Sequence, residues 1–131
     1  MKIKDVVKEY GLSADTLRYY EKIGLIDPVK KDESGHRHYR KKDLYRIEFL
    51  KRMRLAGCSI ETLQKFVELY NEGPDTIPQR QALLHEQRDL LEEKIKTLET
   101  ARTYLEEQLA YYDQHMIVKD TIARTLEEGE D

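Results

Sequence analysis

The chain has 131 residues, of which 39% are hydrophobic and 37% are charged, with only 3 prolines and 6 glycines. This length holds one compact domain and an appendage, since a domain takes about 100 to 150 residues. The composition is typical of a helix-rich soluble protein and excludes a disordered chain. Apolar runs are far shorter than the roughly 20 residues of a membrane span, and the first residues do not resemble a signal peptide. We therefore expect no membrane contact and a cytoplasmic location.

The net charge of −3 is distributed unevenly along the chain. Residues 1–73 contain 16 Lys and Arg against 12 Asp and Glu, whereas residues 74–131 contain 7 against 14. Residues 30–54 alone contain 10 basic and 4 acidic side chains. A local excess of cations followed by an acidic region is typical of a protein that binds phosphates through one of its parts.

The first 22 residues predict two short helices joined by a tight turn. Apolar side chains recur at helical spacing from Ile3 to Tyr10, and Gly11 follows where a left-handed C-cap residue is expected. Ser13 is a favourable N-cap for a second helix that continues to about Lys22. Two helices joined by a glycine-containing turn are typical of a helix-turn-helix.

A β-hairpin is predicted next. Residues 29–31 and 36–40 are interpreted as strands, and residues 32–35 as the turn between them, where Gly35 permits a tight bend. Such a hairpin would form the wing of a winged helix-turn-helix.

Two further helices complete the predicted N-terminal domain, residues 1–73. The first runs from about Lys41 to Leu55, and the second has Ser59 as its N-cap and ends before Gly73. We expect an apolar face of each helix to pack into a shared core. The residues of these faces are Leu44, Ile47, Leu50 and Met53 in the first helix and Ile60, Leu63, Val67 and Tyr70 in the second.

A long helix is predicted from Ile77 to about Asp113, with Thr76 in a capping-box pattern at its start. At a rise of about 1.5 Å per residue it would span roughly 55 Å, and a helix of that length needs a partner. Apolar side chains recur along it at the heptad spacing of a coiled coil, and we call them the dimer seam. They are Leu84, Leu91, Leu98, Leu105 and Tyr112 at one heptad position and Ile95, Leu109 and Met116 at the other.

Two arginines, Arg88 and Arg102, interrupt the dimer seam. Because burying an unpaired guanidinium is costly, we expect an antiparallel pair of helices with limited overlap, in a homodimer. The predicted architecture is therefore mainly α: a winged helix-turn-helix followed by a long antiparallel coiled-coil helix. Residues 74–116 would form this dimerisation helix. Residues 117–131 would form a short C-terminal tail, helical over 118–127 and frayed over 128–131.

The second helix carries the candidate residues for nucleic-acid recognition. In a recognition helix the exposed N-terminal side chains face base edges in the major groove, where Arg can bind guanine through two hydrogen bonds. The candidates for base contact are Ser13, Ala14, Thr16 and Arg18. Tyr19 suits contact with phosphate oxygens, and so does Tyr20 unless it packs in the core. The alternative is a solvated helix with Leu17 and Tyr20 facing inward.

The hairpin is predicted to add contacts to the DNA backbone. Arg37 and Tyr39 share one strand face, with the alternative that one of the pair points into the core. Lys30 and Arg40 lie beside them in a cationic run that also includes Lys31, Lys41 and Lys42. Each neutralised phosphate steepens the log–log salt dependence of binding by about 0.9, so we expect salt-sensitive binding. The alternative is that the run is only a solvated surface.

Several motifs of residues 3–55 resemble the MerR family of bacterial transcription regulators. They are Leu17-Arg18-Tyr19-Tyr20-Glu21, Gly24-Leu25-Ile26, Gly35-His36-Arg37-His38-Tyr39 and Asp43-Leu44. The resemblance implies an antiparallel dimerisation helix and operator contacts from Arg18, Tyr19, Arg37 and Tyr39. It also implies a palindromic operator in double-stranded promoter DNA whose spacer is too long, and distortion of that DNA so that RNA polymerase can use both hexamers.

The sequence does not identify the effector that such a regulator would sense. Thiolate metal sensors of this family carry several cysteines at the dimer helix and beyond it, where this chain has none, and larger members append a ligand-binding domain that this length does not hold. His85 and His115 are too far apart on one helix to share a metal, so we expect no metal and no other cofactor.

The single cysteine, Cys58, excludes an intrachain disulfide. By resemblance to some small members, Cys58 is a candidate sensor of electrophiles or oxidants, if the start of the helix capped by Ser59 lowers its pKa. The alternative is that it packs as a small buried hydrophobe.

Two other functions remain as alternatives. The winged helix could bind protein while the long helix assembles it, or the chain could be a phage-type architectural factor with a similar winged helix. An enzyme is not expected, because no nucleophile, base and orienting group occur in a recognisable pattern and no glycine-rich phosphate loop is present.

Overall fold

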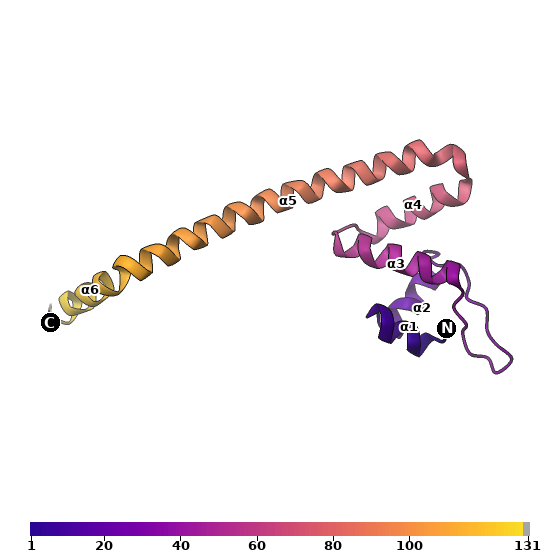
Figure 1. The fold of residues 1–131 in the computed structure, drawn as a ribbon, viewed down its shortest axis with the longest axis horizontal. Helices are drawn as coiled ribbons and strands as arrows, with labels where there is room; N and C mark the ends of the chain where they lie inside the picture. Colours follow the sequence, from indigo (N-terminus) through magenta and orange to yellow (C-terminus); the bar gives the residue numbers. More distant parts are fainter. Residues whose placement is uncertain (130–131) are drawn as a thin grey trace. The chain divides into compact units, whose positions relative to one another are not determined.

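The computed structural model describes residues 1–129, apart from the side chains of Met116 and Ile117, and this part of the chain is mainly helical (Figure 1). It divides into two compact units, residues 1–91 and the part from Glu92 onwards, and the longest helix contributes to both. The elements in chain order are α1 (Ile3–Tyr10), α2 (Ala14–Lys22), α3 (Lys41–Leu55), α4 (Ile60–Glu72), the 3-10 turn η1 (Pro74–Thr76), α5 (Ile77–Tyr111), the π-helical turn η2 (Tyr112–Met116) and α6 (Ile117–Gly129).

Local capping explains the bounds of the first two helices. α1 ends at Gly11, whose φ of 70° is left-handed and whose N–H donates to the carbonyl of Val7 at 3.0 Å. α2 begins after Ser13, whose hydroxyl oxygen accepts from the backbone N–H of Thr16 at 3.0 Å. Both predicted helices are confirmed.

The predicted third and fourth helices, α3 and α4, are confirmed as well. Ser59 caps α4, because its hydroxyl oxygen accepts from the backbone N–H of Thr62 at 3.1 Å. At the start of α3, the carboxylate of Asp43 accepts from the backbone N–H of Arg40 at 2.9 Å. Each helix therefore begins where a side chain satisfies a free backbone donor.

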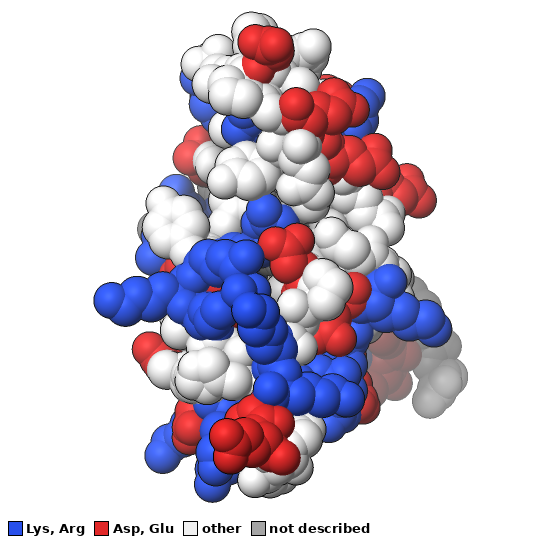
Figure 2. Space-filling model, turned by 90° about the vertical axis from the view of Figure 1, so that its right-hand side faces the viewer, with Lys and Arg blue, Asp and Glu red and all other residues white. Residues whose placement is uncertain are grey.

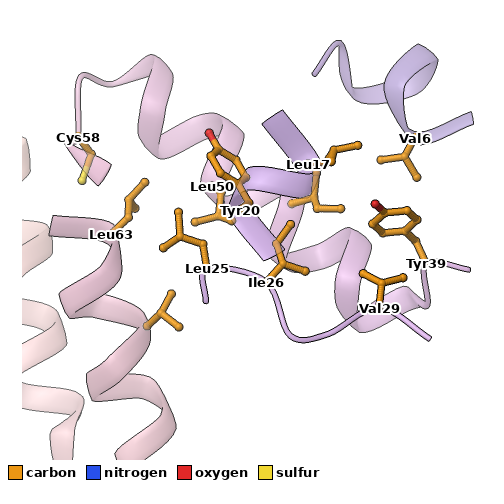
Figure 3. Packing of buried hydrophobic residues seen from close by; sticks show 12 residues of the cluster. Val6, Leu17, Tyr20, Leu25, Ile26, Val29, Tyr39, Leu50, Cys58 and Leu63 are labelled. Carbon is orange, nitrogen blue, oxygen red and sulfur yellow. The ribbon is translucent and has the colours of Figure 1, made fainter. Parts of the chain in front are cut away.

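The hydrophobic core lies in the first unit, where α1, α2, α3 and α4 meet (Figure 3). Its buried residues are Val6, Leu17, Tyr20, Leu25, Ile26, Val29, Tyr39, Ile47, Leu50, Cys58, Leu63 and Val67. The predicted core face of α4 needs one correction, since Tyr70 is 54% exposed. Instead of apolar side chains, the guanidinium groups of Arg46 and Arg80 lie over the Tyr70 ring, each 5.2 Å from its centroid.

Residues 29–40 form a hairpin without regular strands, so the two predicted strands are corrected to an isolated bridge. Lys31 and Arg37 form this bridge, and the N–H of His38 donates to the carbonyl of Lys30 at 2.8 Å. The predicted turn and the direction of the two arms are otherwise present.

A competing partner explains why the strands stay short. The N–H of Tyr39 donates to the carbonyl of Met1 at 2.8 Å, and the N-terminal ammonium of Met1 donates to the carbonyl of Tyr39 at 3.0 Å. Lys2 and His38 form a second isolated bridge. The second arm of the hairpin thus pairs partly with the first arm, at Lys31, and partly with the N-terminal residues, at Met1 and Lys2. Neither pairing is long enough to form a regular strand.

The connection between α4 and α5 differs from the predicted capping box. Thr76 is buried, and its hydroxyl lies 2.5 Å from the carbonyl oxygen of Leu69 and 2.8 Å from that of Gly73. The hydroxyl can donate a hydrogen bond to either oxygen. Nε of Arg80 donates to the hydroxyl oxygen of Thr76 at 3.1 Å. Thr76 therefore links the end of α4 to the first turn of α5 instead of capping α5.

The second unit contains the remainder of α5, followed by η2 and α6. The long predicted helix is confirmed as far as Tyr111, and the predicted tail helix is confirmed as α6. Residues 128 and 129 belong to α6 and are not frayed, while residues 130–131, also predicted to fray, lie outside the described residues. None of the helices in residues 1–129 combines the length and apolar character that crossing a bilayer requires.

Candidate nucleic-acid interface

The first turn of α2 presents the side chains that the sequence predicted to read bases. Ser13 and Arg18 are exposed, and Ala14 and Thr16 are partly buried. The hydroxyl of Ser13 donates to that of Thr16 at 2.9 Å, which fixes both at the helix start. Nη1 of Arg18 lies 3.3 Å from Oδ1 of Asp15, whose side chain is 97% exposed. Since so exposed an ion pair contributes little, Arg18 can exchange it for a contact with DNA.

The two adjacent tyrosines of α2 divide between surface and core. Tyr19 is half exposed, so its ring is available to a phosphate backbone. Tyr20 is buried beside it, with the ring centroids 6.5 Å apart. Successive residues of a helix point about 100° apart, so a core-facing Tyr20 leaves Tyr19 outside. Tyr20 is therefore corrected from a candidate DNA contact to a core residue.

Arg37 and Tyr39 do not share an exposed face. Tyr39 is only 2% exposed, and its burial raises the pKa of its hydroxyl although Arg37 acts in the opposite direction. The ring of Tyr39 points into the core (Figure 3). Its predicted DNA contact is corrected, and the alternative that one of the pair faces the core is what the structure has.

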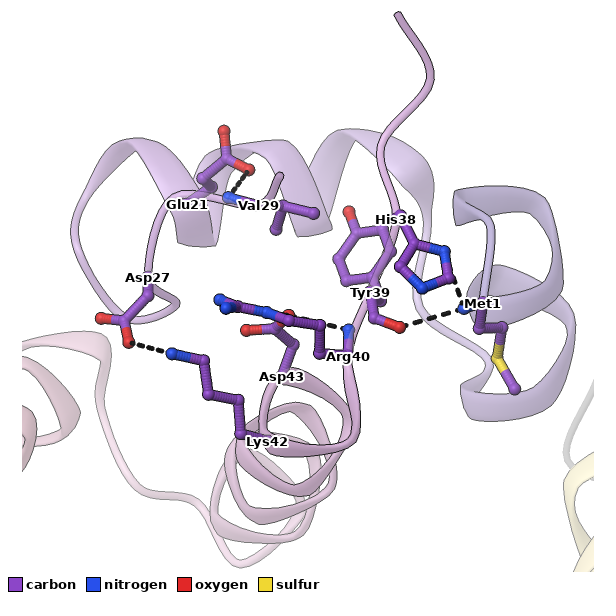
Figure 4. A network of polar contacts seen from close by, with 9 residues as sticks. All are labelled: Met1, Glu21, Asp27, Val29, His38, Tyr39, Arg40, Lys42 and Asp43. Carbon is purple, nitrogen blue, oxygen red and sulfur yellow. Dashed lines mark hydrogen bonds and ion pairs between the residues drawn. The ribbon is translucent and has the colours of Figure 1, made fainter. Parts of the chain in front are cut away.

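Glu21, at the end of α2, joins the hairpin to the candidate recognition helix. Nε and Nη2 of Arg37 lie 3.4 Å from Oε1 and Oε2 of Glu21, respectively. Oε1 also accepts from the backbone N–H of Val29 at 3.1 Å (Figure 4). The Arg37 and Glu21 side chains are 27% and 22% exposed, so water shields their pair less than a surface ion pair.

Sequence reasoning did not single out Glu21. An acidic side chain in the last turn of a helix is unfavourable next to the negative end of the helix dipole, and it is relieved by a cationic partner. That position was the available signal, but it does not identify Arg37, which lies 16 residues further along the chain.

Two cations near the start of α3 are held by carboxylates (Figure 4). Nε of Arg40 lies 3.4 Å from Oδ2 of the buried Asp43. Nζ of Lys42 lies 3.9 Å from Oδ2 of Asp27. Lys30, on the other arm of the hairpin, is exposed. These cations remain candidates for contacts with phosphates because none of them is buried.

The tip of the hairpin carries a negative charge. The carboxylate of Asp32 accepts from the backbone N–H groups of His36 and Ser34, both at 2.9 Å. These hydrogen bonds, that from His36 foremost, lower the pKa of Asp32. Because an ionised carboxylate repels phosphates, the cationic arms suit DNA better than the tip.

Figure 2 shows Lys and Arg side chains gathered over the middle and lower part of one face, with Asp and Glu side chains among and above them. Residues 30–54 carry a local excess of cations along the chain. Such a surface attracts a polyanion while individual carboxylates orient its cations.

Cys58 lies in the core and is 1% exposed. Its burial raises the pKa of the thiol, and the neighbouring Arg54 only partly opposes this. Nη1 of Arg54 donates to the Cys58 carbonyl at 2.8 Å. A buried thiol with a raised pKa is a poor nucleophile, which favours the packing role over the sensor role. Within residues 1–129, no three His, Cys, Asp or Glu side chains are grouped to hold a metal ion.

The predicted dimer seam is exposed on the single chain. Leu98, Leu105 and Leu109 are each more than 60% exposed, and Leu84, Ile95 and Tyr112 are 40% to 52% exposed. Leu91 is partly buried, and the side chain of Met116 lies outside the described residues. A row of exposed leucines at heptad spacing is typical of a coiled-coil helix.

Comparison with known proteins identifies the family. Residues 1–69 match the family described as "MerR HTH family regulatory protein", and residues 44–108 match "MerR, DNA binding". The HTH-type transcriptional regulator AdhR of Bacillus subtilis is 48% identical over 91 residues, which cover 70% of this chain and 65% of that protein, slightly less than two thirds of its length. An uncharacterized HTH-type transcriptional regulator of Haemophilus influenzae is 35% identical over 107 residues, 82% of this chain and 79% of that protein.

Solved structures agree with this match. A protein of Listeria monocytogenes, assigned to the MerR family of transcriptional regulators, has a TM-score of 0.82 at 37% identity and covers 100% of this chain and 99% of its own. HiNmlR, described as a MerR family regulator lacking the sensor domain and bound to promoter DNA, has a TM-score of 0.77 at 31% identity and covers 90% of this chain and 94% of its own. The chain thus belongs to the MerR family of helix-turn-helix regulatory proteins and is a DNA-binding regulator of transcription.

Proposed function

We propose that two copies of this chain bind a palindromic operator within a promoter and distort its DNA to control transcription. One arrangement carries the proposal: α2 presents the exposed Arg18 in its N-terminal half, and the Arg37–Glu21 pair holds a cationic hairpin against the same helix. A recognition helix flanked by a basic hairpin combines base contacts with backbone contacts. That HiNmlR is described as bound to promoter DNA supports a similar partner here.

The two groups of candidate residues have different roles in this proposal. Ser13, Ala14, Thr16 and Arg18 face the base edges, with Arg18 able to bind guanine through two hydrogen bonds. Phosphate contacts fix the position of the protein on the duplex without reading its sequence. We assign these contacts to Tyr19, Lys30, Arg37 and Arg40, all of which have exposed or partly exposed side chains.

Dimerisation supplies the second recognition helix. Pairing with a second copy buries the exposed leucines of the dimer seam. The twofold axis of such a dimer matches the symmetry of a palindromic operator. The antiparallel arrangement leaves Arg88 and Arg102 able to reach solvent or acidic partners, which a long parallel zipper would not allow.

Distortion of the operator is the regulatory step in the proposal. Bending and untwisting a site costs on the order of 1 to 10 kcal/mol, and phosphate contacts along both half-sites provide this energy. The distorted spacer would then let RNA polymerase use both promoter hexamers. The role is regulatory, not catalytic, and the names of the relatives favour it over a protein-interaction module or an architectural factor.

Footprinting on the promoter region beside the gene tests this function. We expect wild-type protein to protect an inverted repeat and Arg18→Ala to lose this protection. The matched control is Arg52→Ala on α3, which removes one exposed cation that pairs with Glu48 and that is not among the assigned DNA contacts. A wild-type chain that protects no DNA at low salt, or an Arg52→Ala variant that fails together with Arg18→Ala, would contradict the assignment.

A further inference from the structure

A cavity of about 690 Å³ lies in the first unit, and its lining shares Lys42, Asp27 and Asp43 with the candidate nucleic-acid interface. Its lining comes from α3, α4, the start of α5 and the segment after α2. This volume is within the roughly 300–1,000 Å³ that small-molecule sites occupy in proteins. Three aromatic and two cationic side chains are among its lining residues: Phe49, Phe66, Tyr70, Arg46 and Arg80.

One part of the cavity is apolar and aromatic. The rings of Phe49 and Phe66 lie 5.1 Å apart at an angle of 33°, and both side chains are partly buried. Ile26 and Val67, both buried, line the cavity beside them. Aromatic and branched apolar side chains of this kind bind a flat hydrocarbon body by excluding water from it.

Two positioned guanidinium groups also line the cavity. Nη1 of Arg46 donates to the carbonyl of Leu25 at 3.0 Å. Nε of Arg80 donates to the hydroxyl of Thr76 at 3.1 Å, and Nη2 donates to the carbonyl of Gly73 at 3.3 Å. A guanidinium has five N–H donors, so both groups keep donors for a ligand.

The charges around the cavity are not balanced. Lys42 pairs with Asp27 at 3.9 Å, and the buried Asp43 pairs with Arg40. Among the described residues, by contrast, no carboxylate lies within ion-pair distance of Arg46 or Arg80. These two cations are held by neutral carbonyl and hydroxyl groups and by the Tyr70 ring, and they still lack an anion.

From this combination we propose that the cavity is a binding site for a small organic anion with a flat apolar body, such as an aromatic carboxylate. The body lies against Phe49 and Phe66, and the carboxylate binds Arg46 and Arg80, with the charge-assisted hydrogen bonds that guanidinium and carboxylate groups form. Such a ligand contacts α3 and the first turns of α5 at once. The site goes beyond DNA binding and does not depend on it.

A matched pair of ligands tests the proposal on the full chain. 2-Naphthoate and 2-naphthamide share the same ring system and differ in charge, so calorimetric titration with each isolates the contribution of the anion. We expect the carboxylate to bind at least about tenfold more tightly than the amide, in line with charge-assisted pairing to guanidinium. Amide NMR shifts on adding naphthoate should concentrate near Phe49 and Phe66 and spare the surroundings of Cys58.

Three variants identify the residues responsible. Arg46→Gln and Arg80→Gln should each reduce the preference for naphthoate by at least about fivefold, because the uncharged amide cannot form the ionic bond. Arg52→Gln, on the same helix as Arg46 and paired with Glu48, should leave the preference unchanged. Circular dichroism and operator footprinting on the same variants show whether they fold and bind DNA, so a failed cavity and a failed DNA interface give different results.

Two outcomes would overturn the proposal. Equal affinities for naphthoate and naphthamide in wild type would show that the guanidinium groups do not select an anion. No saturable binding of either compound to the full-length protein would favour an apolar segment of a second copy as the occupant. Sedimentation equilibrium would then show whether the cavity variants weaken dimerisation.

Discussion

Arg37 of the hairpin and Glu21 at the end of α2 form a two-point ion pair, with Nε–Oε1 and Nη2–Oε2 distances of 3.4 Å. The same Oε1 accepts from the backbone N–H of Val29 on the other arm of the hairpin. One carboxylate of α2 therefore contacts both arms. α2 therefore positions the hairpin for binding DNA beside it. Arg37 supplies a positive charge and also helps to hold the hairpin in place.

Glu21→Gln should reduce both stability and operator affinity. The amide keeps an oxygen that can accept from Val29 but loses the ion pair with Arg37, so we expect a loss of about 1 to 2 kcal/mol in the free energy of unfolding. Operator affinity should fall although the variant has one negative charge fewer, because the hairpin is no longer held beside α2. Urea denaturation and a fluorescence anisotropy titration measure the two quantities.

Glu33→Gln is the matched control for charge. Glu33 is exposed in the turn of the hairpin, so its replacement removes the same charge without affecting the contacts of Glu21. We expect unchanged stability and equal or higher operator affinity. If both variants raised the affinity alike, charge alone would explain the result and the positioning role of Glu21 would be wrong.

Arg18→Ala and Lys30→Ala should weaken binding in different ways. Loss of a base contact from Arg18 should cost about 1 to 3 kcal/mol on the specific operator and reduce discrimination against altered sites. Loss of a phosphate contact from Lys30 should weaken binding to all sequences alike and reduce the slope of log K against log salt by about 1. Titrations of operator and scrambled duplexes at several salt concentrations separate the two. An equal loss of discrimination in both variants would contradict these roles.

The helices were predictable because the signals that define them are local. Gly11 ends α1 and Ser13 and Ser59 begin α2 and α4, and each acts on backbone groups within four residues. Tyr70 shows where this local reasoning fails. Its spacing matches the core face of α4, but cations from α3 and α5 lie over its ring.

The candidate interface was predicted only in outline, because its details depend on contacts between distant segments. Strand alternation places Arg37 and Tyr39 on the same face but does not say which one the core accepts. The pairing of Tyr39 with Met1 spans 38 residues, and sequence spacing gives no signal for it. Because Tyr39 is fixed by that pairing and buried, Arg37 is the residue that pairs with Glu21. The position of Glu21 in the sequence does not identify Arg37 as its partner.

Leu98→Glu should convert the proposed dimer to single subunits. The side chain of Leu98 is 68% exposed on the single chain, so the replacement removes little packing within the subunit. In a paired helix it would bury an unpaired carboxylate, which is costly. Sedimentation equilibrium should show monomers at concentrations where wild type is dimeric, and operator affinity should fall with the loss of the second recognition helix.

Thr100→Glu is the control for this variant, because it introduces the same charge on α5 two residues from Leu98 and outside the dimer seam. It should remain dimeric. A Leu98→Glu protein that stays dimeric, or a Thr100→Glu protein that dissociates as readily, would show that the pairing surface lies on another face of α5.

Cys58 should react slowly with alkylating agents in the native protein. Burial raises the pKa of its thiol, so less thiolate is present at neutral pH than for a free cysteine, and the side chain is 1% exposed. Iodoacetamide should modify Cys58 much more slowly than it modifies the thiol of glutathione. Concentrated urea should remove this difference in rate. A native rate equal to that of glutathione would restore the sensor role, and inducer responses that Cys58→Ser abolishes would do the same.

The raised pKa of Cys58 also predicts how stability depends on pH. Since the folded state favours the neutral thiol, its contribution is fully present below the ordinary thiol pKa of about 8.5 and is lost as the pH rises through the higher folded pKa. The free energy of unfolding of wild type should therefore decrease above pH of about 8.5 more steeply than that of Cys58→Ala. Urea denaturation of both proteins across this range measures the difference. Burial of Cys58 in the core should make its native thiol harder to ionise than the unfolded one. Parallel pH profiles of the two proteins would contradict this.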